Sequence, residues 1–237
     1  MIGTIINAVC IIAGGIIGAF AANWLTASAQ NRIKLILAIA TTYVATEMIW
    51  RGVNGSFLKC LGQLGIAFLS LILGNALGMA LRLQKGLNWL GQIAKEHIAK
   101  GEQGGSKFNE GFITCSILFC VGPMAIIGAM EDGLTGNFKV LAIKGAMDGL
   151  ATVGFTAMFG WGSALSVVPV VAYQGTITIC AGLLEPVLTE PMIDAIRVTG
   201  GMLVYSITVV ILEIRKVPLA NYLPAMVVAP LLTWWWM

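Results

Sequence analysis

The stretch KVLAIKGAMDGLATVGFTAMFGWG (139–162) places Lys144 and Asp148 inside a long apolar segment. The uncharged run 149–184 that follows Asp148 is too long for one membrane helix and too short for two. Its FGWG (159–162) predicts a tight turn, because glycines punctuate helical segments. The preceding helix is therefore predicted over 139–159, and it carries both charged side chains into the membrane.

The composition of the whole chain also indicates a membrane environment. Of 237 residues, 58% are hydrophobic and only 11% are charged, which is about half the charged fraction of a soluble domain. About 20 apolar residues span a bilayer as a helix, so long uncharged runs predict membrane spans. Such runs are 1–31, 60–81, 111–130, 149–184, 198–212 and 217–237.

We predict an all-α polytopic membrane protein in which residues 1–237 form a single transmembrane domain with about eight transmembrane helices. The first run has no basic leader and no A-x-A-type cleavage site, which favours a retained helix over a cleaved signal peptide. The predicted spans are 2–24, 34–50, 60–81, 111–130, 139–159, 161–184, 195–213 and 217–236.

The first three and the last three spans suggest an internal repeat. Residues 1–81 align with residues 161–237 with small, apolar and polar positions roughly in phase, and residues 111–160 then form a central helical hairpin. Identities are few, so a chance likeness between apolar helices is the alternative. With eight spans, the two triplets have opposite orientations, an inverted repeat typical of secondary transporters.

The loop 82–110 sets the predicted orientation. Leu83, Leu87, Leu90, Ala94 and Ile98 recur at helical spacing beside lysines, which predicts an amphipathic helix on the inner membrane surface. If this loop is cytoplasmic, basic residues concentrate on the inner side, as the positive-inside rule requires, and both termini lie outside the cytoplasm.

Lys144 and Asp148 are the strongest candidates for function. They are four residues apart, so they share one helix face and can pair. Asp148 lies roughly 13 Å along its helix, close to the midplane of the bilayer. Charges at that depth cost at least about 2.5 kcal/mol each and face protein or water-filled cavities. The alternative is a mutually neutralising pair that only holds the helix packing.

The central hairpin contributes four further candidates. Pro123 cannot donate its amide, so the helix is predicted to kink or break near mid-depth, and Gly122 permits close backbone approach. A carbonyl freed there could bind a cation or polar substrate together with Asp148. Glu131 and Asp132 in EDGLTGN (131–137) could attract cations at an outer mouth, or they could simply cap the loop.

Other spans add polar residues to the predicted ion or substrate pathway. Asn7 comes from the first span, and Ser166, Tyr173 and Gln174 come from the sixth, where Ser166 and Tyr173 share one face. Glu47 is better explained by an exposed pair with Arg51 at i+4. The five cysteines lack a C-x-x-C spacing, so we expect free thiols, no metal site and no cofactor.

The order of motifs resembles the bacterial membrane family designated domain of unknown function 554, the YdfK-like proteins. The resemblance implies a polytopic protein of the bacterial inner membrane and supplies no substrate or catalytic residues. Many relatives have LQDGL where this chain has MEDGL, so Glu131 is not assigned a shared role. The matching stretches are IGTIINAVCIIAGGIIG (2–18), LFCVGPMAIIGAMEDGLTGN (118–137), KGAMDG (144–149), YQG (173–175) and VPLANYLPAMVVAPLL (217–232).

These patterns predict a small transporter or ion-conducting permease, gated by the buried Lys144 and Asp148 pair. The alternative is a non-transporting assembly or signalling factor that docks partners through its cytoplasmic loop. An intramembrane enzyme ranks last, because only four groups offer acid, base or nucleophile chemistry. We expect the lipid bilayer and a small ion or solute as partners, a homodimer, and no nucleic-acid binding.

Overall fold

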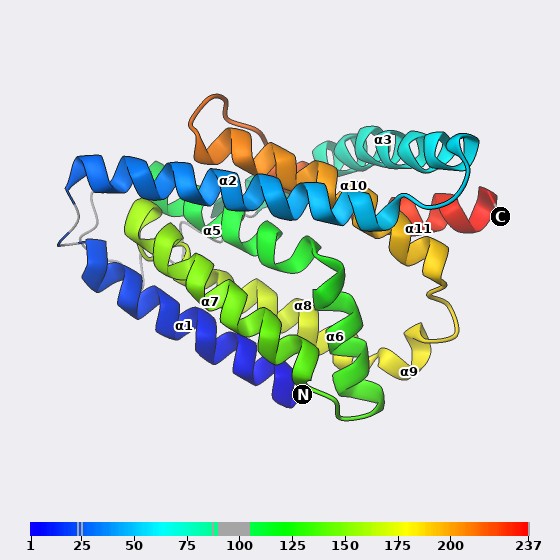
Figure 1. Cartoon of the computed structure of the whole chain (residues 1–237), viewed down its shortest axis with the longest axis horizontal. Coiled ribbons are helices and arrows are strands. Elements are labelled where there is room, and N and C mark those ends of the chain that lie inside the picture. Colours follow the sequence, from blue (N-terminus) through cyan, green and yellow to red (C-terminus); the bar gives the residue numbers. More distant parts are fainter. Residues whose placement is uncertain (23, 25, 87, 90–104, 237) are drawn as a thin grey trace. The chain divides into compact units, whose positions relative to one another are not determined.

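The computed structural model describes residues 1–22, 24, 26–86, 88–89 and 105–236, and all regular secondary structure within these ranges is helical (Figure 1). The chain forms two compact units. The first unit contains residues 1–37, 86–120 and 124–185, and the second contains residues 38–85, 121–123 and 186–237.

Several helices are long and apolar enough to cross a membrane. Within the described ranges five meet this condition singly, and a bent pair meets it jointly, with an angle of 59° between its two helices. The chain is therefore a multi-pass membrane protein. The five helices are α1 (Ile2–Ala22), α2 (Ala27–Gly52), α3 (Phe57–Ala80), α7 (Lys139–Phe159) and α10 (Glu190–Ile211), and the pair is α5 (Gly105–Val121) with α6 (Pro123–Leu134).

The helix predicted over 139–159 is confirmed by α7, which has the same bounds. Gly160 ends it with a φ of +80°, a left-handed conformation that favours glycine. The break predicted at Pro123 is also present, because α5 ends at Val121 and α6 begins at Pro123. Helix α5 begins at Gly105, inside the predicted loop 82–110, since Phe108 is buried and extends its apolar face.

Two predicted spans are interrupted. The segment 161–184 consists of a 3₁₀ turn η1 (Ala164–Ser166), α8 (Val167–Ile179) and α9 (Ala181–Leu184). The segment 217–236 consists of a 3₁₀ turn η2 (Leu219–Tyr222) and α11 (Ala225–Trp236). In the second of these segments Pro224 separates η2 from α11, since proline lacks an amide hydrogen, whereas Pro169 and Pro230 lie inside α8 and α11. The count of eight spans and the inverted repeat stay predictions, as does the amphipathic helix, most of which lies outside the described residues.

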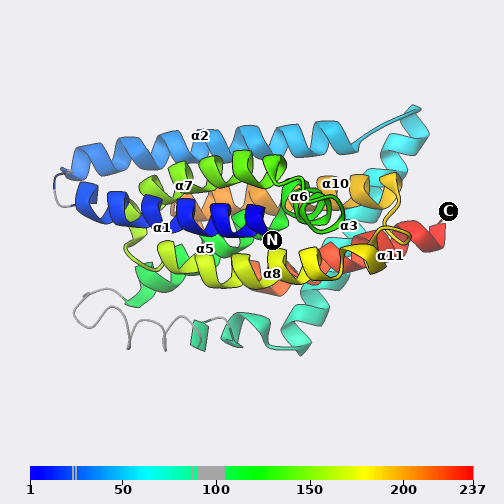
Figure 2. The same ribbon diagram turned by 90° about the horizontal axis from the view of Figure 1, so that it is seen from below.

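Helices α1 and α7 of the first unit lie side by side and parallel (Figures 1 and 2). Glycines bring their backbones together: a Cβ on Gly14 would overlap the Gly149 carbonyl, and a Cβ on Gly149 would lie 2.8 Å from the Cys10 carbonyl oxygen. Such small residues permit the close packing on which membrane helices depend. The AGGIIGA stretch (13–19) thus has the packing role predicted for it.

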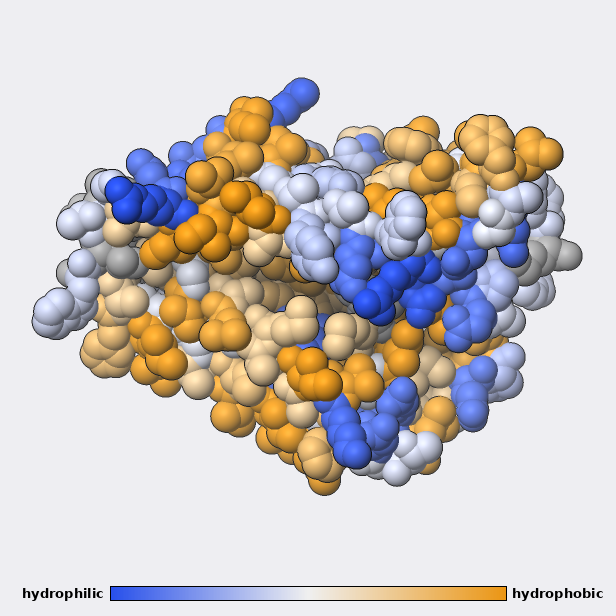
Figure 3. Space-filling model, viewed as in Figure 1, coloured by the Kyte–Doolittle hydropathy of each residue, from blue (hydrophilic) through white to orange (hydrophobic). Residues whose placement is uncertain are grey.

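Glycines also bring helices of the second unit close together. Gly74 and Gly78 of α3 face the backbones of Ala225 and Asn221, as predicted for GNALG (74–78). A Cβ on Gly201 of α10 would lie 2.8 Å from the Ala45 carbonyl oxygen of α2. The remaining surface is largely apolar, and Figure 3 shows hydrophobic side chains over much of the face that it draws. These exposed apolar side chains fit a lipid environment.

Candidate functional site

The ion pair of α7 is buried within the first unit. The Lys144 ammonium Nζ donates a hydrogen bond to Asp148 Oδ2, and the two side chains are only 7% and 10% exposed. Four residues separate them, so one helical turn brings their side chains together. Asp148 lies nine residues beyond the first residue of α7, or roughly 13 Å along a helix.

Two amide side chains complete the cluster around this pair. Asn7 Nδ2 of α1 lies 3.2 Å from Asp148 Oδ2 and 3.2 Å from Gln174 Oε1 of α8. Both amide residues are completely buried. The structure therefore brings together four of the predicted residues, Lys144, Asp148, Asn7 and Gln174, from three helices. We refer to these four residues as the polar cluster.

The glycines around Asp148 explain how a short asparagine side chain reaches it. Gly145 and Gly149 flank Asp148 in GAMDG, and a Cβ on Gly145 would lie 2.9 Å from the Asn7 Cα. With larger residues at these positions, α1 would be held further from α7. The sequence that carries the charge thus also carries the small residues that let α1 approach it.

Two contacts partly offset the cost of burying this ion pair. A buried ion pair is stable only when its geometry is good and additional hydrogen bonds satisfy its polar atoms. Asn7 supplies one such bond to the carboxylate. The ring of Phe119 on α5 supplies a second contact to the ammonium, whose Nζ lies 5.7 Å from the ring centroid, within cation–π distance.

The carboxylate also fixes the orientation of both amides. Because a carboxylate only accepts hydrogen bonds, Asn7 must turn Nδ2 toward Asp148, and Gln174 must then turn Oε1 toward Asn7. This leaves Asn7 Oδ1, an acceptor, and Gln174 Nε2, a donor, buried without a hydrogen-bond partner among the described residues. Buried polar atoms in native proteins are nearly always bonded, so these two atoms point to a bound water or ligand.

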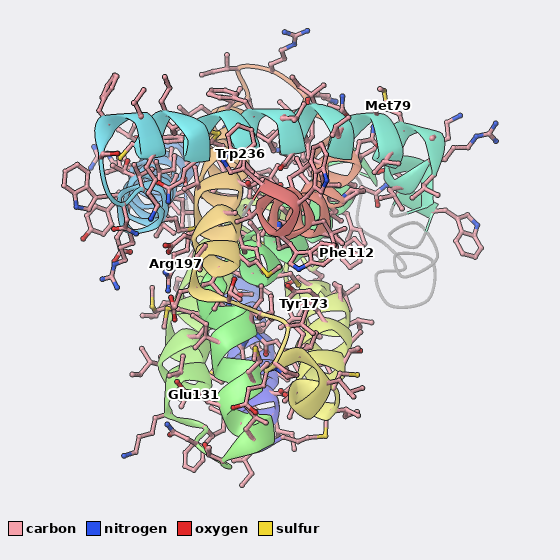
Figure 4. The ribbon with its side chains drawn as sticks, turned by 90° about the vertical axis from the view of Figure 1, so that its right-hand side faces the viewer. Met79, Phe112, Glu131, Tyr173, Arg197 and Trp236 are labelled. Carbon is pink, nitrogen blue, oxygen red and sulfur yellow. The ribbon has the colours of Figure 1, made fainter. Side chains whose placement is uncertain are left out.

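Among the described residues, neither Ser166 nor Tyr173 forms a hydrogen bond with the ion pair. Ser166 is buried, and its hydroxyl donates to the Ser163 carbonyl at 2.7 Å. Tyr173 is half-buried on α8 (Figure 4). Gly122 and Pro123 form the break between α5 and α6 and belong to the second unit, so their predicted alignment with Asp148 stays a prediction.

The predicted outer mouth contains two different environments. Asp132 is buried at the end of α6, where its Oδ2 accepts a hydrogen bond from the Gly3 amide at 3.0 Å. It thereby satisfies an amide in the first turn of α1, as an N-terminal capping carboxylate does. Glu131, labelled in Figure 4, instead accepts a hydrogen bond from Asn137 Nδ2 at 2.9 Å.

Sequence reasoning missed a set of buried hydroxyls next to the polar cluster. Thr152 and Thr156 continue the four-residue spacing of Lys144 and Asp148 along α7, so the signal was present in the sequence. In the same way, Thr4 is one turn from Asn7, and Thr178 is one turn from Gln174. All four threonines are buried.

The site and the fold together define a class of protein. It is an all-helical, multi-pass membrane protein with a buried ionic cluster in one of its two units. Among the described residues, no group of three or more histidine, cysteine, aspartate or glutamate side chains could hold a metal ion.

Comparison with known proteins places the chain within this class. The chain belongs to the family described as "Protein of unknown function (DUF554)", whose family model matches residues 2–234. This confirms the resemblance seen in the motifs. The chain is 29% identical to "Uncharacterized membrane protein YdfK" of Bacillus subtilis over 230 residues, which cover 97% of this chain and 94% of that protein. It is 26% identical to "Uncharacterized protein YqgA" of Escherichia coli over 238 residues, covering 99% and 97% of the two chains. No solved structure matches the chain significantly.

Proposed function

We propose that this protein is a secondary transporter or ion-conducting permease of the bacterial inner membrane, and that the polar cluster is its ion or solute site. The observation that carries the proposal is the buried Lys144 and Asp148 pair, hydrogen-bonded from α1 and packed against α5. Ionisable residues within membrane helices are expensive and by default indicate a functional pathway.

The pair provides the switch in this mechanism. When a proton or cation binds Asp148, its carboxylate no longer holds the Lys144 ammonium, and the Asn7 amide loses its charged acceptor. The contacts that join α1 and α7 to α8 then change together, because one Asn7 nitrogen donates to both Asp148 and Gln174. A change of this kind could alter which side of the membrane reaches the cluster.

The proposed topology has eight spans, with inverted three-helix repeats around the hairpin 111–160 and both termini outside the cytoplasm. The parallel packing of α1 and α7 supports an odd number of membrane crossings between them. Helices α2 and α3 and the bent pair of α5 and α6 supply three crossings. The interrupted segments 161–184 and 217–236 would supply the sixth crossing and the last, since broken helices occur in transporters where they line a site.

Ligand-dependent thermal stability tests the proposal. The purified protein is heated with a panel of ions, amino acids and small organic acids, because a ligand that binds only the native state raises its melting temperature. The proposal expects at least one ligand whose stabilisation is lost in Asp148→Asn and kept in Glu47→Gln. If Asp148→Asn does not fold, the double variant Lys144→Gln/Asp148→Asn, which removes both charges, replaces it. Stabilisation of equal size in both variants would contradict the proposal.

A further inference from the structure

Buried hydroxyls continue the polar cluster in both directions within the first unit. Thr4 and Thr178 lie toward the end of the unit that contains Asp132, and Thr156 and Thr114 lie toward the opposite end. Each of these four hydroxyl oxygens is buried and has no hydrogen-bond partner among the described residues. Native proteins leave few buried polar atoms unbonded, so their concentration in one unit needs a physical explanation.

The packing of the helices establishes the order of these groups along the unit. Helix α8 runs antiparallel to α1, since Gly15 of α1 faces Ala164, Asn7 bonds to Gln174, and Gly175 faces Met1. Thr178 lies beyond Gln174 at the Asp132 end, where its carbonyl faces Gly133 of α6.

Helices α7 and α5 give the order on the other side of the pair. Thr152 donates to the Asp148 carbonyl at 2.6 Å, and Thr156 lies one turn further, facing Gly18 of α1. Helix α5 runs antiparallel to α7, because Gly111 faces Phe159 whereas Phe119 faces Lys144. Thr114 of α5 therefore lies, along the length of the unit, between the level of Phe159 and the level of Lys144. Along the length of the unit these hydroxyls therefore occur in order on both sides of the polar cluster, and we refer to this ordered set, with the cluster, as the file.

The spacing of the file distinguishes between possible ligands. Residues one helical turn apart on a face have Cβ atoms about 5–6 Å apart, and one water that bonds two hydroxyls spans about 5.5 Å. A dehydrated metal cation such as Ca²⁺ instead needs about six to eight oxygen ligands that converge on one point. The file contains successive single oxygens and one carboxylate already paired with Lys144, which suits a chain of waters.

We propose that this file is a water-filled proton pathway and that the proton is the ion exchanged at Asp148; the assignment rests on the proposed transport function and names its coupling ion. A proton passes from water to water between the hydroxyls and forms an O–H bond with an Asp148 carboxylate oxygen. The ion pair with Lys144 is then lost. The same proton leaves to the waters on the other side, which restores the carboxylate and the pair.

The titratable groups around Asp148 permit this assignment. Lys144 lies on its own helix and carries the opposite charge. The titratable side chains on the neighbouring helices are Cys115 and Cys120 of α5, Tyr173 of α8, which precedes Gln174, and Cys10 of α1, whose backbone faces Gly149. These are thiols and a phenol, which are ordinarily uncharged at neutral pH. Asp148 is therefore the acid whose protonation changes the charge of the cluster.

Infrared difference spectroscopy after a pH jump, on the full chain in lipid nanodiscs, tests the pathway directly. The expected signal is a carboxylic-acid carbonyl band that Asp148→Asn removes and Asp148→Glu shifts, so the assignment does not depend on one variant. Thr4→Val, Thr178→Val and Thr156→Val should each slow the appearance of this band by about fivefold, the factor that corresponds to one ordinary hydrogen bond. Thr199→Val is the matched control, because its hydroxyl is also buried and has no hydrogen-bond partner in the described part of the chain, but lies on α10 of the second unit.

Two results would overturn the proton pathway. One is the absence of any Asp148-dependent band over the pH range in which the protein stays folded. The other is a band that appears at the wild-type rate in all three threonine variants. If the band is absent but a ligand still stabilises the protein through Asp148, the proton assignment fails and the transport function stands. If the band behaves as expected but no ligand or flux depends on Asp148, the pathway stands and the transport function fails.

Discussion

Asn7 of α1 donates a hydrogen bond to Asp148 of α7, with 3.2 Å between Nδ2 and Oδ2. The same nitrogen donates to Gln174 of α8 at 3.2 Å. One buried amide therefore couples the charge state of α7 to two neighbouring helices. Because Lys144 is held by the same Asp148 oxygen, any change at the carboxylate reaches all four members of the polar cluster.

Removing the Asn7 amide should destabilise the first unit. Asn7→Leu keeps an apolar side chain of comparable size but leaves the Asp148 carboxylate with one donor fewer. We expect a loss of about 1–3 kcal/mol, the usual effect of leaving a buried group unsatisfied. Unfolding of the purified protein by denaturant measures this, with Thr176→Val as control because that hydroxyl is exposed on α8. Equal stabilities of the two variants would contradict the role of the amide.

The two charges should be strongly coupled in a double-mutant cycle. Lys144→Met and Asp148→Asn each leave an uncompensated buried group and should each cost about 3–5 kcal/mol. The double variant should cost clearly less than the sum, since it leaves no lone charge. Thermal and denaturant unfolding of the three variants and the wild type give the coupling free energy. Simple additivity would show that Lys144 and Asp148 do not depend on each other.

The close packing of α1 on α7 should depend on individual glycines. In Gly149→Ala the new methyl group would approach the Cys10 carbonyl oxygen to 2.8 Å, so the helices must separate. We expect a loss of about 1–3 kcal/mol, as for overpacking in a core. Gly62→Ala on α3 is the control, because nothing lies within 4 Å of a Cβ there. This control should be neutral or should gain up to about 1 kcal/mol from helix propensity. A Gly149→Ala variant as stable as the control would contradict the close approach.

The surface pair of Glu47 and Arg51 should contribute little by comparison. Their side chains are 39% and 71% exposed, with 2.6 Å between Glu47 Oε1 and Arg51 Nη2. Exposed pairs at i, i+4 contribute about 0.3–0.5 kcal/mol. Arg51→Gln should therefore shift the melting temperature far less than Lys144→Met. A melting-temperature shift of similar size in both variants would mean that the buried pair contributes no more to stability than the exposed pair.

The sequence predicts the helices best where apolar runs end at clear signals. Helix α7 has its predicted bounds because FGWG places glycine at the position that needs a left-handed backbone, and the Glu47 and Arg51 pair follows from helical spacing alone. In the segments 161–184 and 217–236 the structure has shorter helices, and hydropathy alone does not show where such breaks fall, for example at Pro224 between η2 and α11.

The candidate site is predictable only in part. Spacing along one helix pairs Lys144 with Asp148, but no sequence pattern states that Asn7 and Gln174 meet them, since this depends on how α1 and α8 pack against α7. The buried capping role of Asp132 likewise depends on a partner far away in the chain. The homodimer and the docking role of the loop 82–110 stay predictions.

The most direct test of the central claim is a measurement of ion flux through the protein reconstituted in vesicles. Gradients of H⁺, Na⁺, K⁺ and Cl⁻ are imposed, and Asp148→Asn and Glu47→Gln are measured in parallel with the wild type. The account predicts at least one flux that Asp148→Asn lowers about tenfold or more, equivalent to at least about 1.4 kcal/mol, and that Glu47→Gln leaves unchanged. A flux of the same size through a folded Asp148→Asn variant, or no flux above protein-free vesicles, would contradict it.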